Sequence, residues 1–167
     1  MVVTASFSTL LLLFFAFGFR LYRVSYDSMS PNFNDGDIIL CLLSNSASRG
    51  DVIVFRAPYG ERSVKRIVAV EGDRVFLGAG HLVVNETPLA KSHYTKAYGK
   101  HGADFFYTEV VDGQAYTVQD TYFHRSFLPF AGKIDGYYVL GDNRHESLDS
   151  RSYGPVRPNR VCRIVAY

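Results

Sequence analysis

The chain has 167 residues, which is enough for one domain with or without an added anchor segment. Its formal net charge is only +2 and no basic cluster stands out, so composition excludes a nucleic-acid partner. Tyr and Phe bring the aromatic content to 15%, and such residues favour strands over helices. Composition therefore indicates a mostly β protein.

The first feature along the chain is an uncharged apolar segment from Val2 to Phe19. As a helix it would be about 27 Å long, close to the hydrocarbon thickness of a bilayer. It lacks the positive start and small-residue end of a cleaved signal peptide, and it has no polar face as a core helix would. We therefore expect a single transmembrane anchor in residues 1–20, followed by a β-rich domain in residues 21–167.

The rest of the chain consists of short apolar runs separated by turn residues, and Asn85-Glu86 is a plausible hairpin turn. This pattern predicts an antiparallel β sandwich or barrel. Residues 91–135 are polar and aromatic-rich, and we interpret them as a less regular excursion from the β core. The expected strands cover residues 37–42, 51–55, 64–70, 74–77, 81–84, 105–111, 116–118, 137–140 and 161–165.

Cysteines and histidines give no metal-site pattern. Cys41 and Cys162 each lie in an apolar run, and the default interpretation is two small core residues. A disulfide between them would require an oxidising compartment, and sequence does not place them near each other. His93, His101 and His124 have irregular spacings that match no ligand motif. We expect neither a metal nor a cofactor.

Two polar side chains are candidates for nucleophilic chemistry. Ser28 begins Ser-Met-Ser-Pro, nine residues beyond Phe19, so it must stay within about 30 Å of the apolar segment. In the strand that follows Ser63, Lys65 would share a face with Ile67. A lysine on an apolar face tends to lose its proton and can then act as a general base. The alternative is an edge lysine whose stem covers apolar surface while its amine reaches water.

The most informative segment runs from Gly141 to Val156, directly after an apolar run. Hydrogen-bonding side chains fill it, and beside a core strand they must bond one another or form a site. A polar surface loop is the alternative. The side chains of interest are Asp142, Asn143, Ser147, Asp149, Ser150 and Arg151.

Four motifs together resemble type I signal peptidases in identity and order. They are Ser28-Met29-Ser30-Pro31, Arg49-Gly50-Asp51-Val52-Ile53-Val54-Phe55, Lys65-Arg66-Ile67-Val68-Ala69-Val70-Glu71-Gly72-Asp73, and the run from Gly141-Asp142-Asn143-Arg144 to Ser147, Asp149, Ser150, Arg151 and Gly154. The resemblance covers the anchor and most of the domain.

This resemblance implies a Ser-Lys dyad, with Ser28 as nucleophile and Lys65 as general base. The Ser28 backbone N–H would contribute to the oxyanion hole. Ser147 would hydrogen-bond and orient the lysine. The resemblance also implies a structural ion pair between Asp149 and Arg151, and supporting positions at Asp142 and Asn143.

The chain departs from the family pattern at three positions. Tyr26 stands where bacterial members have Ser or Gly, so a side-chain oxyanion donor is not expected there. Glu86 replaces a frequent Gly, and Glu71 replaces a frequent Pro, a form that also resembles mitochondrial inner-membrane relatives. His145 lies within the last motif and suggests a His-based triad, but the family has no catalytic residue there, so we expect a surface residue.

The expected function is a membrane-anchored serine endopeptidase that removes signal peptides from exported preproteins. Its substrates would carry small residues one and three positions before the cut, as in the family. Arg20 and Arg23 would place the domain on the cytoplasmic side by the positive-inside rule. The expected function instead favours the extracytoplasmic face, because the active domain must face the side to which proteins are exported. We expect the cytoplasmic membrane in preference to an organellar inner membrane. The alternatives are a specialised maturation peptidase and a non-catalytic tethered β domain in which Lys65 stays charged.

Overall fold

The computed structural model describes residues 15–78, 81–99, 102–121 and 130–166. Antiparallel strands dominate these residues, and the order of elements is simple to state. They are β1 (Phe19–Arg23), β2 (Ile38–Ser44), β3 (Val52–Arg56), β4 (Arg62–Ala69), β5 (Arg74–Gly78), β6 (His81–Val84), β7 (Thr87–Pro88), β8 (Ala90–Gly99), β9 (Gly102–Val111), β10 (Gln114–Thr121), β11 (Phe130–Lys133), β12 (Tyr138–Leu140), α2 (Ser150–Tyr153) and β13 (Val161–Ala166).

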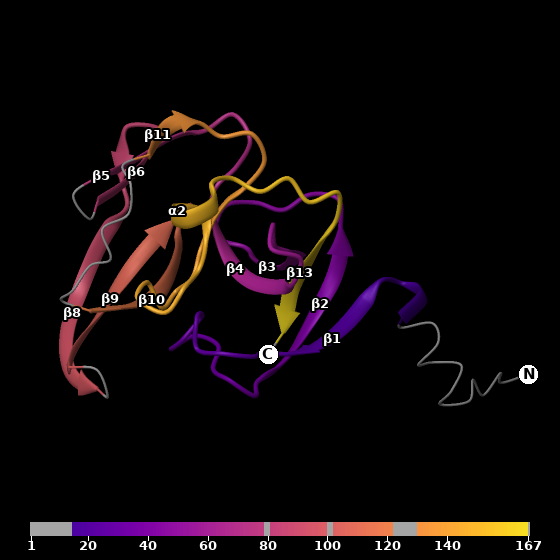
Figure 1. The fold of residues 1–167 in the computed structure, drawn as a ribbon, viewed down its shortest axis with the longest axis horizontal. Helices are drawn as coiled ribbons and strands as arrows, with labels where there is room; N and C mark the ends of the chain where they lie inside the picture. Colours follow the sequence, from indigo (N-terminus) through magenta and orange to yellow (C-terminus); the bar gives the residue numbers. More distant parts are fainter. Residues whose placement is uncertain (1–14, 79–80, 100–101, 122–129, 167) are drawn as a thin grey trace, which may run out of the picture.

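The strands form three sheets (Figure 1). The largest has six strands in the order β1-β2-β13-β3-β4-β12, the second has β10-β9-β8, and the third has β11-β5-β6-β7. The pairings between named strands in all three are antiparallel. The prediction of a mostly β, antiparallel fold is confirmed, and each strand expected from sequence corresponds to an observed one.

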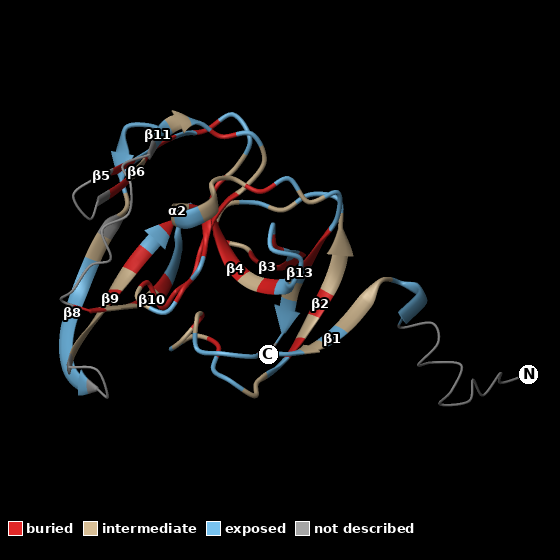
Figure 2. Ribbon diagram, viewed as in Figure 1, coloured by how far each residue is buried: buried red, intermediate tan, exposed pale blue. Residues whose placement is uncertain are grey.

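Strand β4 lies inside the six-stranded sheet between β3 and β12, and this position sets the environment of the candidate site. Buried residues concentrate in β4 and its neighbours (Figure 2). Consecutive residues Lys65 and Arg66 point to opposite faces of a strand, yet both are buried. The strand is therefore covered on both faces. The desolvation cost of each of these two cations must be offset by hydrogen-bonded partners or by loss of the proton.

Residues 91–135 are more regular than the sequence indicated. Three long strands, β8 to β10, cross this region and pack a small core of their own that includes Tyr107 and Val118. Strand β8 escaped prediction because its residues 92–98 are exposed. With neither face buried, a strand has no reason to alternate apolar and polar residues. Strands β1, β7 and β11 also had no clear sequence signal.

The predicted anchor falls mostly on residues 1–14, which lie outside the described residues. Its last part differs from the prediction, because the described helical residues end at Ala16 and β1 begins at Phe19. In the part of the chain that the structure describes, no helix is long and apolar enough to span a bilayer.

The two cysteines are buried as expected, but they are joined, which corrects the default interpretation. Cys41 on β2 and Cys162 on β13 form a disulfide with their Cα atoms 5.3 Å apart. The sequence could not place them together because 121 residues separate them and only sheet pairing makes β2 and β13 neighbours. The disulfide lies in the same apolar cluster as Val24, Met29 and Phe33.

We predict that replacing both cysteines by alanine lowers the free energy of unfolding. A bridge across so long a loop limits the unfolded chain, and its loss costs about 3–5 kcal/mol. Urea unfolding of oxidised wild type, wild type with reductant, and the double variant measures this. Reductant should destabilise the wild type and leave the double variant unchanged; equal stability of all three would contradict the prediction.

Candidate active site

Ser28 lies in the tight turn that connects β1 to β2. The Ser30 N–H donates to the Asp27 carbonyl oxygen at 3.1 Å, and the Phe33 N–H donates to that of Met29 at 3.0 Å. The Met29 side chain is fully buried in the core. The Ser28 carbonyl oxygen accepts a hydrogen bond from the Asn143 N–H at 3.1 Å. The backbone of Ser28 is thus held from both sides, while its side chain faces a cleft.

Lys65 on β4 reaches Ser28 through buried surroundings. Its side chain is enclosed, with the residue only 3% exposed. The Lys65 Nζ lies 2.6 Å from the Ser28 Oγ and donates a second hydrogen bond to the Val64 carbonyl oxygen at 2.9 Å. Burial lowers the pKa of Lys65 from 10.5 to about 8, since desolvation disfavours the ammonium form. A substantial neutral fraction therefore exists near neutral pH.

Asp149 organises the loop behind this pair. Its buried carboxylate accepts hydrogen bonds from the Gly141 N–H at 2.9 Å and the Ser147 hydroxyl at 2.7 Å. It also caps the first turn of α2 and binds the Arg151 guanidinium through two nitrogens, each at 2.8 Å. Burial, the largest single influence, would raise the pKa of Asp149. The hydrogen bonds and charge of Arg151, together with the hydrogen bonds from Gly141 and Ser147, outweigh it and hold the pKa below its usual range.

A second buried ion pair joins Asp142 to Arg66, the residue after Lys65. The Arg66 Nε and Nη2 donate to the two carboxylate oxygens at 2.9 and 2.7 Å, and Nη1 donates to the Gly50 carbonyl oxygen at 2.9 Å. Asn32, four residues beyond Ser28, donates to the same carboxylate at 2.8 Å. This pair therefore connects β4, the turn after Ser28 and the loop after β12.

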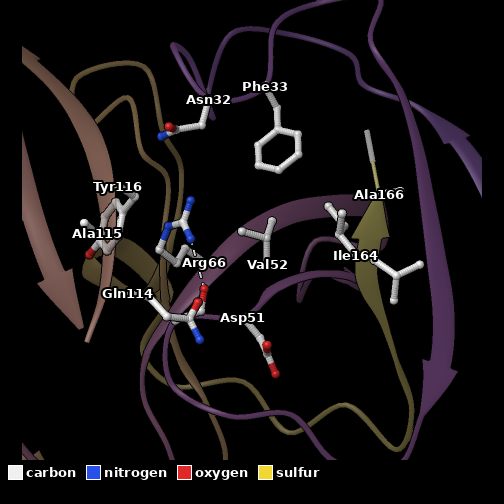
Figure 3. Close-up of a pocket in the computed structure, with 12 residues that line it drawn as sticks. Asn32, Phe33, Asp51, Val52, Arg66, Gln114, Ala115, Tyr116, Ile164 and Ala166 are labelled. Atoms are coloured by element: carbon white, nitrogen blue, oxygen red, sulfur yellow. Dashed lines mark hydrogen bonds between the residues drawn. The ribbon is translucent and has the colours of Figure 1, made fainter. Parts of the chain in front are cut away.

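Figure 3 shows the hollow beside this ion pair, with Arg66 near Tyr116 and Val52. The Arg66 guanidinium carbon lies 4.0 Å from the centre of the Tyr116 ring, and all three of its nitrogens donate to protein oxygens. The guanidinium group is therefore fully engaged by acceptors within the protein. We assign this hollow a structural role.

Two features attach the three-stranded sheet to the site. Glu109 on β9 is fully buried and forms a bidentate ion pair with Arg144, with the Tyr116 hydroxyl as a further donor. The Arg144 Nε donates to the Gly141 carbonyl oxygen at 3.1 Å. In addition, the backbone of Gln119 on β10 exchanges hydrogen bonds with the segment from Asp142 to Arg144. Strands β9 and β10 thus directly support the loop after β12, which is our candidate catalytic loop.

The cleft that contains Ser28 and Lys65 has a volume of about 420 Å³. The first turn after β1, the start of β4 and the loop near Leu148 line it. Val24, Met29 and Val64 contribute apolar surface to its wall, and the last two adjoin Ser28 and Lys65 in the chain.

Comparison with known proteins agrees with this arrangement. The model of the family "Signal peptidase, peptidase S26" matches residues 1–165. The chain is 28% identical over 153 residues to signal peptidase I V of Bacillus subtilis, covering 87% of this chain and 82% of that protein. It is also 28% identical to signal peptidase IB of Staphylococcus aureus, covering 87% of this chain and 75% of that protein.

The chain belongs to the signal peptidase S26 family. A relative from Rickettsia canadensis, signal peptidase I, is 26% identical over 156 residues. That match takes in 82% of this chain but only 55% of the relative, so the chain spans about half the length of that signal peptidase.

Within this signal peptidase domain, the residues selected from sequence gather in one place with one difference in bonding. Ser147 donates to Asp149 rather than to Lys65. His145 is partly exposed, and its Nδ1 lies 3.0 Å from the Thr121 Oγ1, away from a triad arrangement with Ser28. Sequence reasoning assigned no role to Asn32, Arg66, Glu109, Gly141 and Arg144, which the structure places around the site.

Gly141 is required by close packing in the signal peptidase site. A Cβ at this position would overlap the Ser147 side chain and the Ser28 carbonyl oxygen. We predict that Gly141→Ala displaces the Ser28 turn and lowers kcat/KM for peptide cleavage by about 100-fold, as misplacement of about 1 Å does elsewhere. Steady-state cleavage assays measure this.

Gly113→Asn is the control for Gly141→Ala, since nothing lies within 4 Å of a Cβ at position 113 and Asn tolerates its positive φ. It should keep wild-type kcat/KM. Full activity of Gly141→Ala would contradict the observed packing.

Proposed function

We propose that this protein is a membrane-anchored serine endopeptidase that removes N-terminal signal peptides from exported preproteins with a Ser-Lys dyad. The observation that carries the proposal is the 2.6 Å approach of the Lys65 Nζ to the Ser28 Oγ in a buried setting. A lysine with lowered pKa next to a serine hydroxyl is a suitable general base for acyl transfer.

The chemistry proceeds in two steps. Neutral Lys65 accepts the proton of Ser28 while the Ser28 oxygen attacks the scissile carbonyl carbon. The lysine ammonium then returns that proton to the amine of the leaving mature chain, and the peptide C–N bond breaks. In the second step neutral Lys65 accepts a proton from a water while the water oxygen attacks the acyl carbon. The bond between that carbon and the Ser28 oxygen then breaks, Ser28 takes the proton back from Lys65, and the signal peptide leaves with a free C-terminal carboxyl group.

The backbone N–H of Ser28 is our candidate for the oxyanion donor. Among the described residues it has no hydrogen-bond acceptor, while the Ser28 carbonyl oxygen is already engaged by Asn143. A preorganised donor at the nucleophile stabilises the charge that develops on the carbonyl oxygen. Tyr26 contributes no such donor in this proposal, because its side chain is 79% exposed.

The remaining selected residues have supporting roles in this proposal. Asp149 and Arg151 form an ion pair that fixes the loop, and Ser147 adds a hydrogen bond to the same carboxylate. Asp142 holds Arg66 beside Lys65, and Asn143 fixes the Ser28 carbonyl. Burial lowers the pKa of Lys65 most, the charges of Asp149 and Asp142 raise it, and the charge of Arg151 lowers it again.

The substrate in this proposal is a preprotein with small residues one and three positions before the cut. The apolar wall near Ser28 supports this, because Val24, Met29 and Val64 leave a shallow space beside the nucleophile. Small side chains such as Ala would fill it without displacing the wall.

The proposal also includes membrane attachment and a location on the side to which proteins are exported. The uncharged apolar segment that precedes β1 would anchor the domain in the lipid bilayer, with the domain on the extracytoplasmic face. Confining enzyme and preprotein to the same layer raises their effective concentration. The disulfide between Cys41 and Cys162 supports this location, because such bonds form and persist in oxidising compartments.

We predict that Ser28→Ala and Lys65→Met each abolish cleavage of a preprotein with an Ala-x-Ala site. The first removes the nucleophile and the second removes the base, so each should lose at least about 1,000-fold in rate. Mass spectrometry of the products locates the cut. Ser46→Ala and Lys133→Met, which change an exposed serine and an exposed lysine outside the cleft, should retain activity. Undiminished cleavage by Ser28→Ala would end the proposal.

We predict an alkaline pH dependence that follows Lys65. Its pKa lies near 8, so kcat/KM should rise about tenfold per pH unit below that value and level off above it. Because the folded pKa is below the unfolded value of 10.5, the unfolded chain binds more protons between these values, and stability contributed by this group rises with pH there. A pH–rate profile and urea unfolding at matched pH values measure both. A flat profile between pH 6 and pH 8 would contradict the role of Lys65.

A further inference from the structure

A second cavity lies beside the turn that carries Ser28. Its volume is about 540 Å³, and it is lined by Asp27 and Ser30 on either side of Ser28 and by Asn143 of the catalytic loop. Side chains from β9 and β10, among them Asp104, complete it. We call it the acidic cavity.

The acidic cavity is continuous with the cleft that contains Ser28 and Lys65. Tyr26 and Glu146 line both spaces, whereas Lys65 and Val64 line only the cleft. The two spaces therefore share a boundary at Tyr26, two residues before Ser28, and at Glu146. A peptide that crosses this boundary in extended form would have one half in the cleft and the other half in the acidic cavity.

The acidic cavity carries carboxylate side chains. Asp27, Asp104 and Glu146 line it, and among the described residues no lysine or arginine does. Among the described residues, neither Asp27 nor Asp104 forms an ion pair. The Glu146 carboxylate lies 3.8 Å from His145 Nε2, which is a charged partner only when the imidazole is protonated. The cavity therefore presents a negative potential to whatever peptide segment enters it.

These carboxylates do not form a metal site. In the described part of the chain no group of three or more His, Cys, Asp or Glu side chains converges closely enough to hold an ion. Spread over the walls of the cavity, they suit a long, flexible cation that reaches one or two of them, such as a lysine or arginine side chain.

We propose that the acidic cavity receives the first residues of the mature chain and that Asp27, Asp104 and Glu146 favour basic residues there. The apolar wall of the cleft takes the small residues before the cut, which leaves the acidic cavity for the residues after it. This inference rests on the proposed function, since it states where the part of the same substrate that follows the cut would bind.

Peptides that share one sequence before the cut test the proposal directly. They carry Lys, Gln or Glu at the first two positions after the cut, and kcat/KM is measured for each. We expect the order Lys, Gln, Glu, with a Lys-to-Glu ratio of about tenfold at low salt, since several exposed charge contacts each contribute a few-fold. The ratio should fall toward one at about 1 M salt, because the charges are screened.

Variants identify the source of the preference. Glu146→Gln, Asp104→Asn and their combination should reduce the Lys-to-Glu ratio step by step, to about twofold in the combination. Because the ratio is taken within each variant, a general loss of activity does not obscure it. Glu71→Gln removes the same charge at an exposed turn outside both spaces and should keep the wild-type ratio.

The outcomes separate the two proposals. Cleavage of every peptide with equal kcat/KM overturns the inference and leaves the proposed function intact. A preference for Lys that persists in the combined variant also overturns it. If no peptide is cut after the Ala-x-Ala site, the proposed function fails, and the assignment of the acidic cavity fails with it.

Discussion

The burial of one amine is the constraint on which the rest of the structure depends. Lys65 lies in a strand covered on both faces, and its ammonium form is disfavoured there. The nearby carboxylates of Asp149 and Asp142 raise its pKa, and the charge of Arg151, the partner of Asp149, lowers it. Asp142 is paired with Arg66. The two ion pairs hold the loop in place, and burial remains the largest influence on the pKa of Lys65.

The same pairs fasten together segments that are distant in the chain. Asn32 binds Asp142 and the backbone of Thr117, which links the nucleophile turn to the catalytic loop and to β10. Buried Glu109 binds Arg144 and so attaches β9 to the same loop. Breaking one partner of a buried pair leaves an uncompensated charge, which makes such a network costly to disturb. The three-stranded sheet is therefore part of the support of the site and one wall of the acidic cavity.

The disulfide lies close to the turn that carries the candidate nucleophile. The disulfide between Cys41 and Cys162 lies in the apolar cluster that also holds Met29, the residue after the nucleophile. An oxidising compartment would thus contribute to the rigidity of the turn that carries Ser28. The cleft and the acidic cavity meet at this turn, so an extended peptide would bring its scissile bond to the point where the backbone is held most firmly.

The sequence by itself determined the antiparallel β class, nearly every strand with one buried face, and the short motifs that supply Ser28, Lys65 and the loop at Asp149. These signals are local, because alternation and turn residues act over a few positions. Only the tertiary structure decided the pairing of Cys41 with Cys162, the exposed strand β8, the hydrogen bond of Ser147 to Asp149, and the buried partnership of Glu109 with Arg144. Each depends on which strands become neighbours, and sheet pairing joins residues far apart in the chain without leaving a local pattern.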